Sequence, residues 1–120
     1  MVRILVADDQ LVMRNMFKSI LAPAGYDLTL AVDGKDAYTQ ATANDFDMII
    51  TDLYMPHMDG IELTAKLRTL KAYQGKPILI VSTESATKKK DAGKAAGATG
   101  WIVKPVSSDV LLPVVQKLTR

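Results

Sequence analysis

The sequence predicts a single α/β domain built on a doubly wound parallel sheet. Three observations lead to this prediction. Five short stretches with the length and pattern of strands alternate along the chain with five stretches of helical spacing. Most of the strand-like stretches are apolar throughout, which is typical of strands buried on both faces. Each of them ends at polar or charged residues, where the chain is expected to leave the sheet.

Two strands and two helices are expected in the first 44 residues. The apolar run 4–7 predicts a strand, and the four-residue spacing of Val12, Met16 and Ile20 predicts a helix over 10–22. Residues 26–30 alternate apolar and polar side chains, which indicates an edge strand with one wet face. Asp33 and Gly34 then form a turn into a second helix over 35–43.

The middle of the chain contains the third strand and the third helix. Met48, Ile49 and Ile50 form a short apolar run that ends at Thr51 and Asp52, which predicts a buried central strand. Leucines at helical spacing predict a helix over 60–71. We expect Asp59 and Glu62 to form a capping box at the start of this helix.

The last part of the chain repeats the alternation. Residues 78–81 are the most hydrophobic strand, and residues 101–103 are the last strand. Between them lies a predicted helix over 85–96 whose expected apolar face is formed only by Ala86, Ala92, Ala95 and Ala96. A helix with so thin an apolar face should be weakly anchored and mobile. Ser107 is expected to cap the final helix.

The order of the strands follows from their burial. The alternating second strand belongs at an edge, and the uniformly apolar first, third and fourth strands belong inside. These constraints fit the order 2-1-3-4-5, which is the flavodoxin-like arrangement. The chain of 120 residues is expected to form one domain, without repeats or linkers.

Composition excludes several classes of function. The absence of cysteine excludes disulfides, thiol nucleophiles and cysteine-based zinc sites, and a single histidine excludes a multi-histidine metal centre. No apolar run is long enough to cross a membrane, and the N-terminus is too short in apolar residues for a signal peptide, so a soluble, cytoplasmic protein is expected. The net charge is −5 over residues 1–60 and +6 over residues 66–94. The basic stretch has no interleaved aromatic residues, so we expect a solvated helix face and no binding of DNA.

The residues that follow the buried strands carry the expected chemistry. Asp8 and Asp9 follow the first strand, and Asp52 follows the third. Ser82 and Lys104 follow the fourth and fifth. The carboxyl ends of parallel strands lie at one edge of a sheet, so these side chains should converge there. Clustered carboxylates require a cation, and oxygen donors alone favour Mg²⁺. A lysine and a hydroxyl beside that ion suit phosphoryl transfer onto an aspartate.

Four segments of the chain resemble a known family. The segments ILVADD, MIITDLYMPHMDG, ILIVSTES and GWIVKP are similar to the motifs of response-regulator receiver domains, of the single-domain chemotaxis (CheY-like) type. The resemblance covers essentially all 120 residues. It implies a phosphoacceptor protein of a two-component system that is not an enzyme in its own right, although it assists its own phosphorylation and dephosphorylation.

The resemblance also implies roles for individual residues. Asp52 would be the phosphoacceptor. Asp9, Asp8, Asp52 and the backbone carbonyl of Tyr54 would hold Mg²⁺, with Asp8 acting partly through water. Lys104 would pair with Asp52 before phosphorylation and with the phosphoryl group after it.

A second set of residues would carry the conformational response. Ser82 would move to bond the phosphoryl oxygens, and Trp101 stands where the family usually has a tyrosine or phenylalanine switch residue. Thr83 departs from the usual small residue and could narrow the path of Ser82. The bond before Pro105 is expected to be cis. His57, in a turn, is expected to have no functional role.

The expected partners are a histidine kinase as phosphodonor and a downstream protein, such as a flagellar-motor switch or a phosphatase. No DNA or membrane is expected among the partners, and the protein is expected to be a monomer. A phosphorelay shuttle, a phosphate-sink receiver and a receiver fragment of a larger regulator remain open alternatives. A haloacid-dehalogenase-type phosphatase is disfavoured because Tyr54 stands where a second aspartate is needed, and a flavin carrier because Asp8, Asp9 and Gln10 replace its phosphate loop. A receiver that cannot be phosphorylated is disfavoured by the complete set of acids, hydroxyl and lysine.

Overall fold

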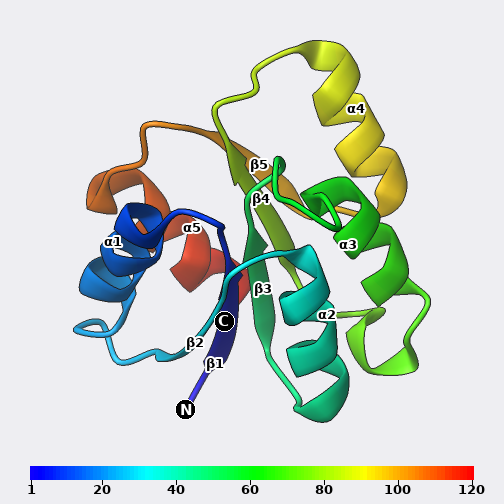
Figure 1. Cartoon of the computed structure of the whole chain (residues 1–120). Helices are drawn as coiled ribbons and strands as arrows, with labels where there is room; N and C mark the ends of the chain where they lie inside the picture. The colour runs from blue at the N-terminus through cyan, green and yellow to red at the C-terminus, as the bar shows by residue number, and fades with distance from the viewer.

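The computed structural model describes all 120 residues and contains five strands that alternate with five α-helices. The strands are β1 (Arg3–Ala7), β2 (Asp27–Ala31), β3 (Met48–Thr51), β4 (Ile78–Ser82) and β5 (Gly100–Val103). The helices are α1 (Leu11–Leu21), α2 (Gly34–Ala43), α3 (Gly60–Arg68), α4 (Thr87–Ala96) and α5 (Ser108–Leu118), with a 3-10 helix η1 (Lys71–Tyr73) after α3. All strand pairs are parallel in the order β2-β1-β3-β4-β5, which confirms the predicted fold class and strand order (Figure 1).

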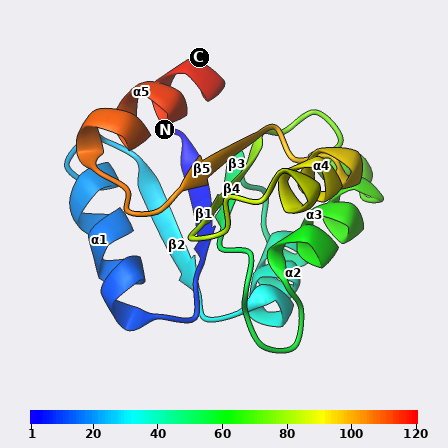
Figure 2. The same cartoon turned by 90° about the horizontal axis from the view of Figure 1, so that it is seen from above.

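The sheet is the middle of three layers. Helices α1 and α5 cover one face, and α2, α3 and α4 cover the other (Figure 2). Side chains of successive strand residues point to opposite faces, so each central strand contributes to two cores. Leu5 and Ile49 pack on the side of α2 and α3, whereas their neighbours Ile4 and Ile50 pack on the side of α1 and α5. This is why β1, β3 and β4 are apolar at nearly every position.

The end of the third helix and the cap of the final helix differ from the prediction. The third helix ends at Arg68, not at residue 71, because the Thr69 N–H turns back to the carbonyls of Lys66 and Leu67, and Leu70 then adopts an extended backbone. The capping box of Asp59 and Glu62 at its start is confirmed. Ser107 occupies the N-cap position of α5, but its side chain makes no capping hydrogen bond. None of the helices combines the length and the apolar character that crossing a bilayer requires.

Helix α4 contacts the sheet differently from the prediction. It begins at Thr87, so Ala86 precedes it, and Ala92 and Ala95 are exposed to solvent. Its one buried residue is Gly93, where an added Cβ would lie 2.8 Å from Cζ3 of Trp101. The helix therefore approaches the sheet through a position without a side chain, and the predicted alanine face was wrong. The weak anchoring is confirmed, because only one residue of α4 is buried.

The two ends of α4 are held unequally. At its C-terminal end, Gly97 has a left-handed backbone with φ of 108°, and its carbonyl accepts a hydrogen bond of 3.0 Å from Nε of Arg68 on α3. The same guanidinium donates to the carbonyls of Tyr73 and Lys76. At the N-terminal end, Ala86 offers no side-chain cap. Any movement of α4 is therefore expected to be larger at its N-terminal end, which lies nearer the predicted site.

Candidate functional site

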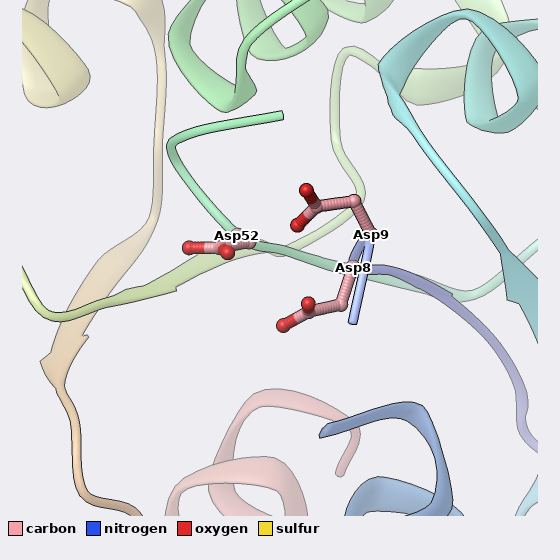
Figure 3. Close-up of side chains that lie close together, drawn as sticks. All are labelled: Asp8, Asp9 and Asp52. Carbon is pink, nitrogen blue, oxygen red and sulfur yellow. The ribbon is translucent and has the colours of Figure 1, made fainter. Parts of the chain in front are cut away.

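The three predicted acids converge at the C-terminal edge of the sheet. Asp8 and Asp9 follow β1, and Asp52 follows β3 at its side, where the Asp52 N–H donates to the carbonyl of Ala7 over 2.8 Å. One carboxylate oxygen from each of the three acids lies within 4.8 Å of the other two (Figure 3). Parallel neighbouring strands thus bring together the acids that the sequence placed at separate strand ends.

Lys104 lies between two of these acids. Its ammonium nitrogen is 3.3 Å from Oδ2 of Asp52, as the prediction requires, and 3.1 Å from Oδ2 of Asp8, a contact that was not predicted. The lysine side chain is only 10% exposed, so this pair of contacts is shielded from solvent. The peptide bond that follows Lys104 is cis, as expected.

The electrostatics of Asp52 reflect burial among like charges. Its side chain is largely buried, and removal from water raises the pKa of Asp52 above the usual value. The ammonium of Lys104 opposes this rise, and the carboxylate of Asp8 adds to it. One ammonium group cannot neutralise three carboxylates, so the cluster keeps excess negative charge. A further cation would stabilise the cluster.

Local backbone contacts hold Asp52 in place. Its Oδ1 accepts the N–H of Leu53 over 2.8 Å. On the other side, Gly60 at the start of α3 lies so close that an added Cβ would be 2.1 Å from the Asp52 carbonyl oxygen. The glycine allows α3 to pack directly on the backbone of the acid.

Ser82 ends β4 beside the lysine. It is completely buried, and its carbonyl accepts the N–H of Lys104 over 2.7 Å. Its hydroxyl oxygen accepts the N–H of Glu84 over 3.2 Å. The hydroxyl oxygen is therefore engaged with the loop between β4 and α4, and a rotation of the side chain away from this loop would break the bond.

A hydrogen bond joins Tyr54, in the loop after β3, to Glu84, in the loop after β4. The half-exposed Tyr54 donates its hydroxyl to Oε1 of Glu84 over 2.5 Å. The carbonyl of Glu84 accepts the indole N–H of Trp101 over 3.0 Å. Thirty positions separate Tyr54 from Glu84 along the chain, so local pattern could not have predicted their contact.

His57 also has a contact that the sequence did not reveal. Its φ is +71°, and its Nδ1 lies 3.0 Å from Oδ2 of Asp33, the N-cap of α2. The backbone N–H of Asp36 and the imidazole of His57 both hold the pKa of Asp33 below its usual value. His57 thereby ties the loop after β3 to α2, which is a structural contact that the sequence did not predict.

The donor set at the sheet edge fits Mg²⁺. The carboxylates of Asp8, Asp9 and Asp52 offer oxygen atoms only, at mutual distances that one small ion can span. Hard oxygen donors and a shortage of positive charge both favour a divalent ion of this type. The backbone of Tyr54 lies two residues beyond Asp52, where the resemblance expects a carbonyl ligand.

Comparison with known proteins gives one consistent result. Residues 4–116 match the family described as the response regulator receiver domain. A chemotaxis protein CheY homologue of Campylobacter jejuni is 38% identical over 111 residues, which cover 91% of this chain and 85% of the relative. Among solved structures, chemotaxis response regulator CheY4 of Vibrio cholerae is 41% identical, with a TM-score of 0.94 and 98% coverage of both chains. Response regulator TrrA of Thermotoga maritima, solved with Mg²⁺ and BeF, is 30% identical, with a TM-score of 0.87 over 98% of this chain and 99% of that one.

Proposed function

The chain belongs to the response-regulator receiver family, and from this premise we propose that it accepts a phosphoryl group on Asp52 and signals through its α4-β5-α5 face. The observation that carries the proposal is the convergence of three carboxylates and Lys104 at one sheet edge. Receiver domains take phosphoryl groups from histidine kinases, so a phosphohistidine on such a kinase is the proposed donor.

The proposed reaction is an in-line displacement at phosphorus. A carboxylate oxygen of Asp52 forms the new P–O bond while the P–N bond to the donor histidine breaks, and the imidazole leaves with the electron pair of that bond. Asp52 suits this role because its Oδ1 is bonded to the N–H of Leu53, which fixes the orientation of the carboxylate. Orientation of the reacting groups accounts for a large share of catalysis in phosphoryl transfer.

Lys104 and Ser82 would stabilise the product. The ammonium of Lys104 already lies within 3.3 Å of Asp52, so it can pair with a phosphoryl oxygen after a small movement. Ser82 would leave the N–H of Glu84 and donate its hydroxyl to a second phosphoryl oxygen. Thr83, which follows it, is exposed and could restrict the path of this movement.

We propose that Asp8, Asp9, Asp52 and the Tyr54 carbonyl hold Mg²⁺ in the working protein. When bound, the ion supplies positive charge that offsets the negative charge on the phosphoryl oxygens. Asp9 is exposed and Asp8 is buried, so Asp9 is the residue best placed to bind an ion that arrives from solvent. The carboxylate of Asp8 is already paired with Lys104.

The output of the switch is proposed to be the face formed by α4, β5 and α5. Movement of Ser82 toward the phosphoryl group would leave room beside β4, and Trp101 on the adjacent strand can turn into it. Trp101 packs over Gly93, so a change in its position would be felt by α4. The exposed lysines Lys88, Lys89 and Lys90 favour a downstream partner that carries acidic groups.

The phosphodonor is proposed to dock on the segments that follow β1, β2 and β3. Four exposed apolar or aromatic side chains lie in the segments that follow β1, β2 and β3, namely Leu11, Val12, Val32 and Tyr54. Exposed apolar groups around a polar site are typical of a protein interface. A kinase domain that buries these groups would place its phosphohistidine over Asp52 and exclude water from the reaction.

A role in chemotaxis is the specific pathway we propose, because the CheY homologues are close relatives. The protein would then be a cytoplasmic monomer whose target is a flagellar-motor switch or a phosphatase, and neither DNA nor a membrane would be a partner. It would act as a phosphoacceptor and not as an enzyme on a separate substrate. A phosphorelay shuttle or phosphate sink would share the chemistry but would pass the phosphoryl group on without binding a motor component.

Trp101 provides the test, since it is the only tryptophan. Addition of a small phosphodonor with Mg²⁺ should change its fluorescence in the wild-type protein, and the change should be absent in Asp52→Asn or when EDTA is present. A response that persists in Asp52→Asn would reject Asp52 as the phosphoacceptor. Pull-down with and without a beryllofluoride mimic would then separate a motor partner from a second phosphotransfer protein.

A further inference from the structure

Glu84 makes four hydrogen bonds that join separate parts of the site. Its N–H donates to the Ser82 hydroxyl over 3.2 Å, and its carbonyl accepts the Trp101 indole over 3.0 Å. One carboxylate oxygen accepts the Tyr54 hydroxyl, and the other accepts the N–H of Ala86 over 3.2 Å. Tyr54 belongs to the loop after β3, and Ala86 is the N-cap of α4. A single residue thus contacts both proposed switch side chains, the proposed metal loop and the entry to α4.

The backbone and the side chain of Glu84 have different consequences. The backbone bonds to Ser82 and Trp101 place the loop 83–86 relative to β4 and β5. The carboxylate bonds to Tyr54 and Ala86 hold the same loop against the loop after β3 and shape the start of α4. Since the N-terminal end of α4 has no side-chain cap of its own, the carboxylate is the polar side chain that fastens it.

We propose that the bond between Tyr54 and Glu84 is a latch that holds the loop 83–86, and with it Trp101, in the conformation of this structure. The proposal rests on the proposed switch, and it makes Tyr54 and Glu84 positioning residues. While the latch is closed, the carbonyl of Glu84 accepts the Trp101 indole N–H, and the Ser82 hydroxyl accepts the Glu84 N–H. When the latch opens, the loop is free to move with Ser82, and the indole N–H loses its acceptor.

The latch is distinct from steric obstruction, in which the bulk of the Tyr54 ring would block water from reaching Asp52. Obstruction depends on the ring, which Tyr54→Phe retains. The latch depends on the hydroxyl, which Tyr54→Phe removes. The two effects can therefore be separated by a change of one oxygen atom.

The experiment follows hydrogen exchange of the Trp101 indole N–H by NMR in protein free of metal and phosphodonor. The single tryptophan gives one indole signal, and its exchange rate is proportional to the population in which the bond to Glu84 is open. We expect exchange about fivefold faster in Tyr54→Phe and in Glu84→Ala, which corresponds to the loss of one hydrogen bond of ordinary strength. The matched control is Tyr38→Phe on α2, which also removes a tyrosine hydroxyl but keeps the ring that packs against Lys66, and it should exchange like the wild type.

Each outcome decides the proposal. Faster exchange in both latch variants, with the control unchanged, supports it. Wild-type exchange in Tyr54→Phe overturns it, because the hydroxyl would then have no influence on the loop. Unfolding of a variant would be recognised by faster exchange throughout the core amides, and Tyr54→Phe is a small enough change to remain folded if Glu84→Ala does not. None of these readings requires phosphorylation, so failure of the phosphoacceptor role, which would appear as no modification of Asp52, is a separate result.

Discussion

The contact between Gly93 and Trp101 gives the sharpest prediction about the signalling face. In Gly93→Ala, the new Cβ would lie 2.8 Å from Cζ3 and 3.1 Å from Cε3 of the indole, and 3.3 Å from Cδ1 of Ile80. Real contacts of this type are longer, so the helix, the indole or both must move. Overpacking of this kind costs about 1–3 kcal/mol.

A second effect acts in the opposite direction. Alanine stabilises the interior of a helix by about 1 kcal/mol relative to glycine, and Gly93 lies inside α4 without a positive φ. The net expectation is a loss of about 1 kcal/mol in the free energy of unfolding. For a chain of 120 residues this corresponds to a fall of about 4 °C in Tm.

The assay combines urea unfolding with the emission spectrum of Trp101 in the resting protein. We expect reduced stability together with an altered indole environment, because the bond to the Glu84 carbonyl must lengthen if the ring is displaced. Gly75→Ala is the matched control, since no atom lies within 4 Å of its added Cβ. A stability gain of about 1 kcal/mol in Gly93→Ala with unchanged emission would refute the close packing of α4 on Trp101.

Three further predictions concern the site and its supports. Gly60→Ala should destabilise the fold by more than about 3 kcal/mol in chemical denaturation, because its Cβ would collide with the backbone of Asp52, and near-wild-type stability would contradict this contact. Lys104→Met should lower stability by about 3 kcal/mol in metal-free buffer, since it leaves buried carboxylates unpaired, and added Mg²⁺ should restore part of the loss; a variant as stable as the wild type without metal would argue against the buried pair. The pKa of Asp33 is lowered in the fold, so its stabilising contribution is present above the ordinary pKa of 3.8 and is lost as the pH falls through the lower folded value; Asp33→Asn should flatten the acid limb of a stability–pH curve, and an unchanged limb would contradict this contribution.

The raised pKa of Asp52 has the opposite effect on the dependence of stability on pH. A carboxyl group that binds its proton more tightly in the folded state loses stabilising influence as the pH rises from the ordinary value of 3.8 through the higher folded value. Above the folded pKa, the ionised carboxylate of Asp52 therefore destabilises the metal-free fold. The acid is retained at a position where burial opposes its charge, which is typical of a functional residue.

The sheet and the acids could be predicted because their signals are local. A buried parallel strand must be apolar on both faces, so β1, β3 and β4 are visible as runs, and the acids that end β1 and β3 are brought together by the topology alone. Neither step requires knowledge of side-chain contacts between distant parts of the chain.

The contacts of α4 and of Glu84 could not be predicted in this way. The buried position of α4 is a glycine, which carries no hydrophobic signal, although an isolated glycine in a helical stretch can indicate close packing. The bonds of Glu84 to Tyr54 and Trp101 join three loops or strands and depend on rotamers that no sequence period encodes. Arg68, whose guanidinium links α3 to the end of α4, is likewise recognisable only in three dimensions.

The proposed function depends on Asp52 being the group that reacts. The most direct measurement is mapping of the modified residue by mass spectrometry after treatment with a small phosphodonor, with borohydride reduction to trap the acyl phosphate, in the presence and absence of Mg²⁺. We predict modification of Asp52 only, and only when Mg²⁺ is present. Modification of another residue, or of Asp52 to the same extent in EDTA, would contradict the central claim.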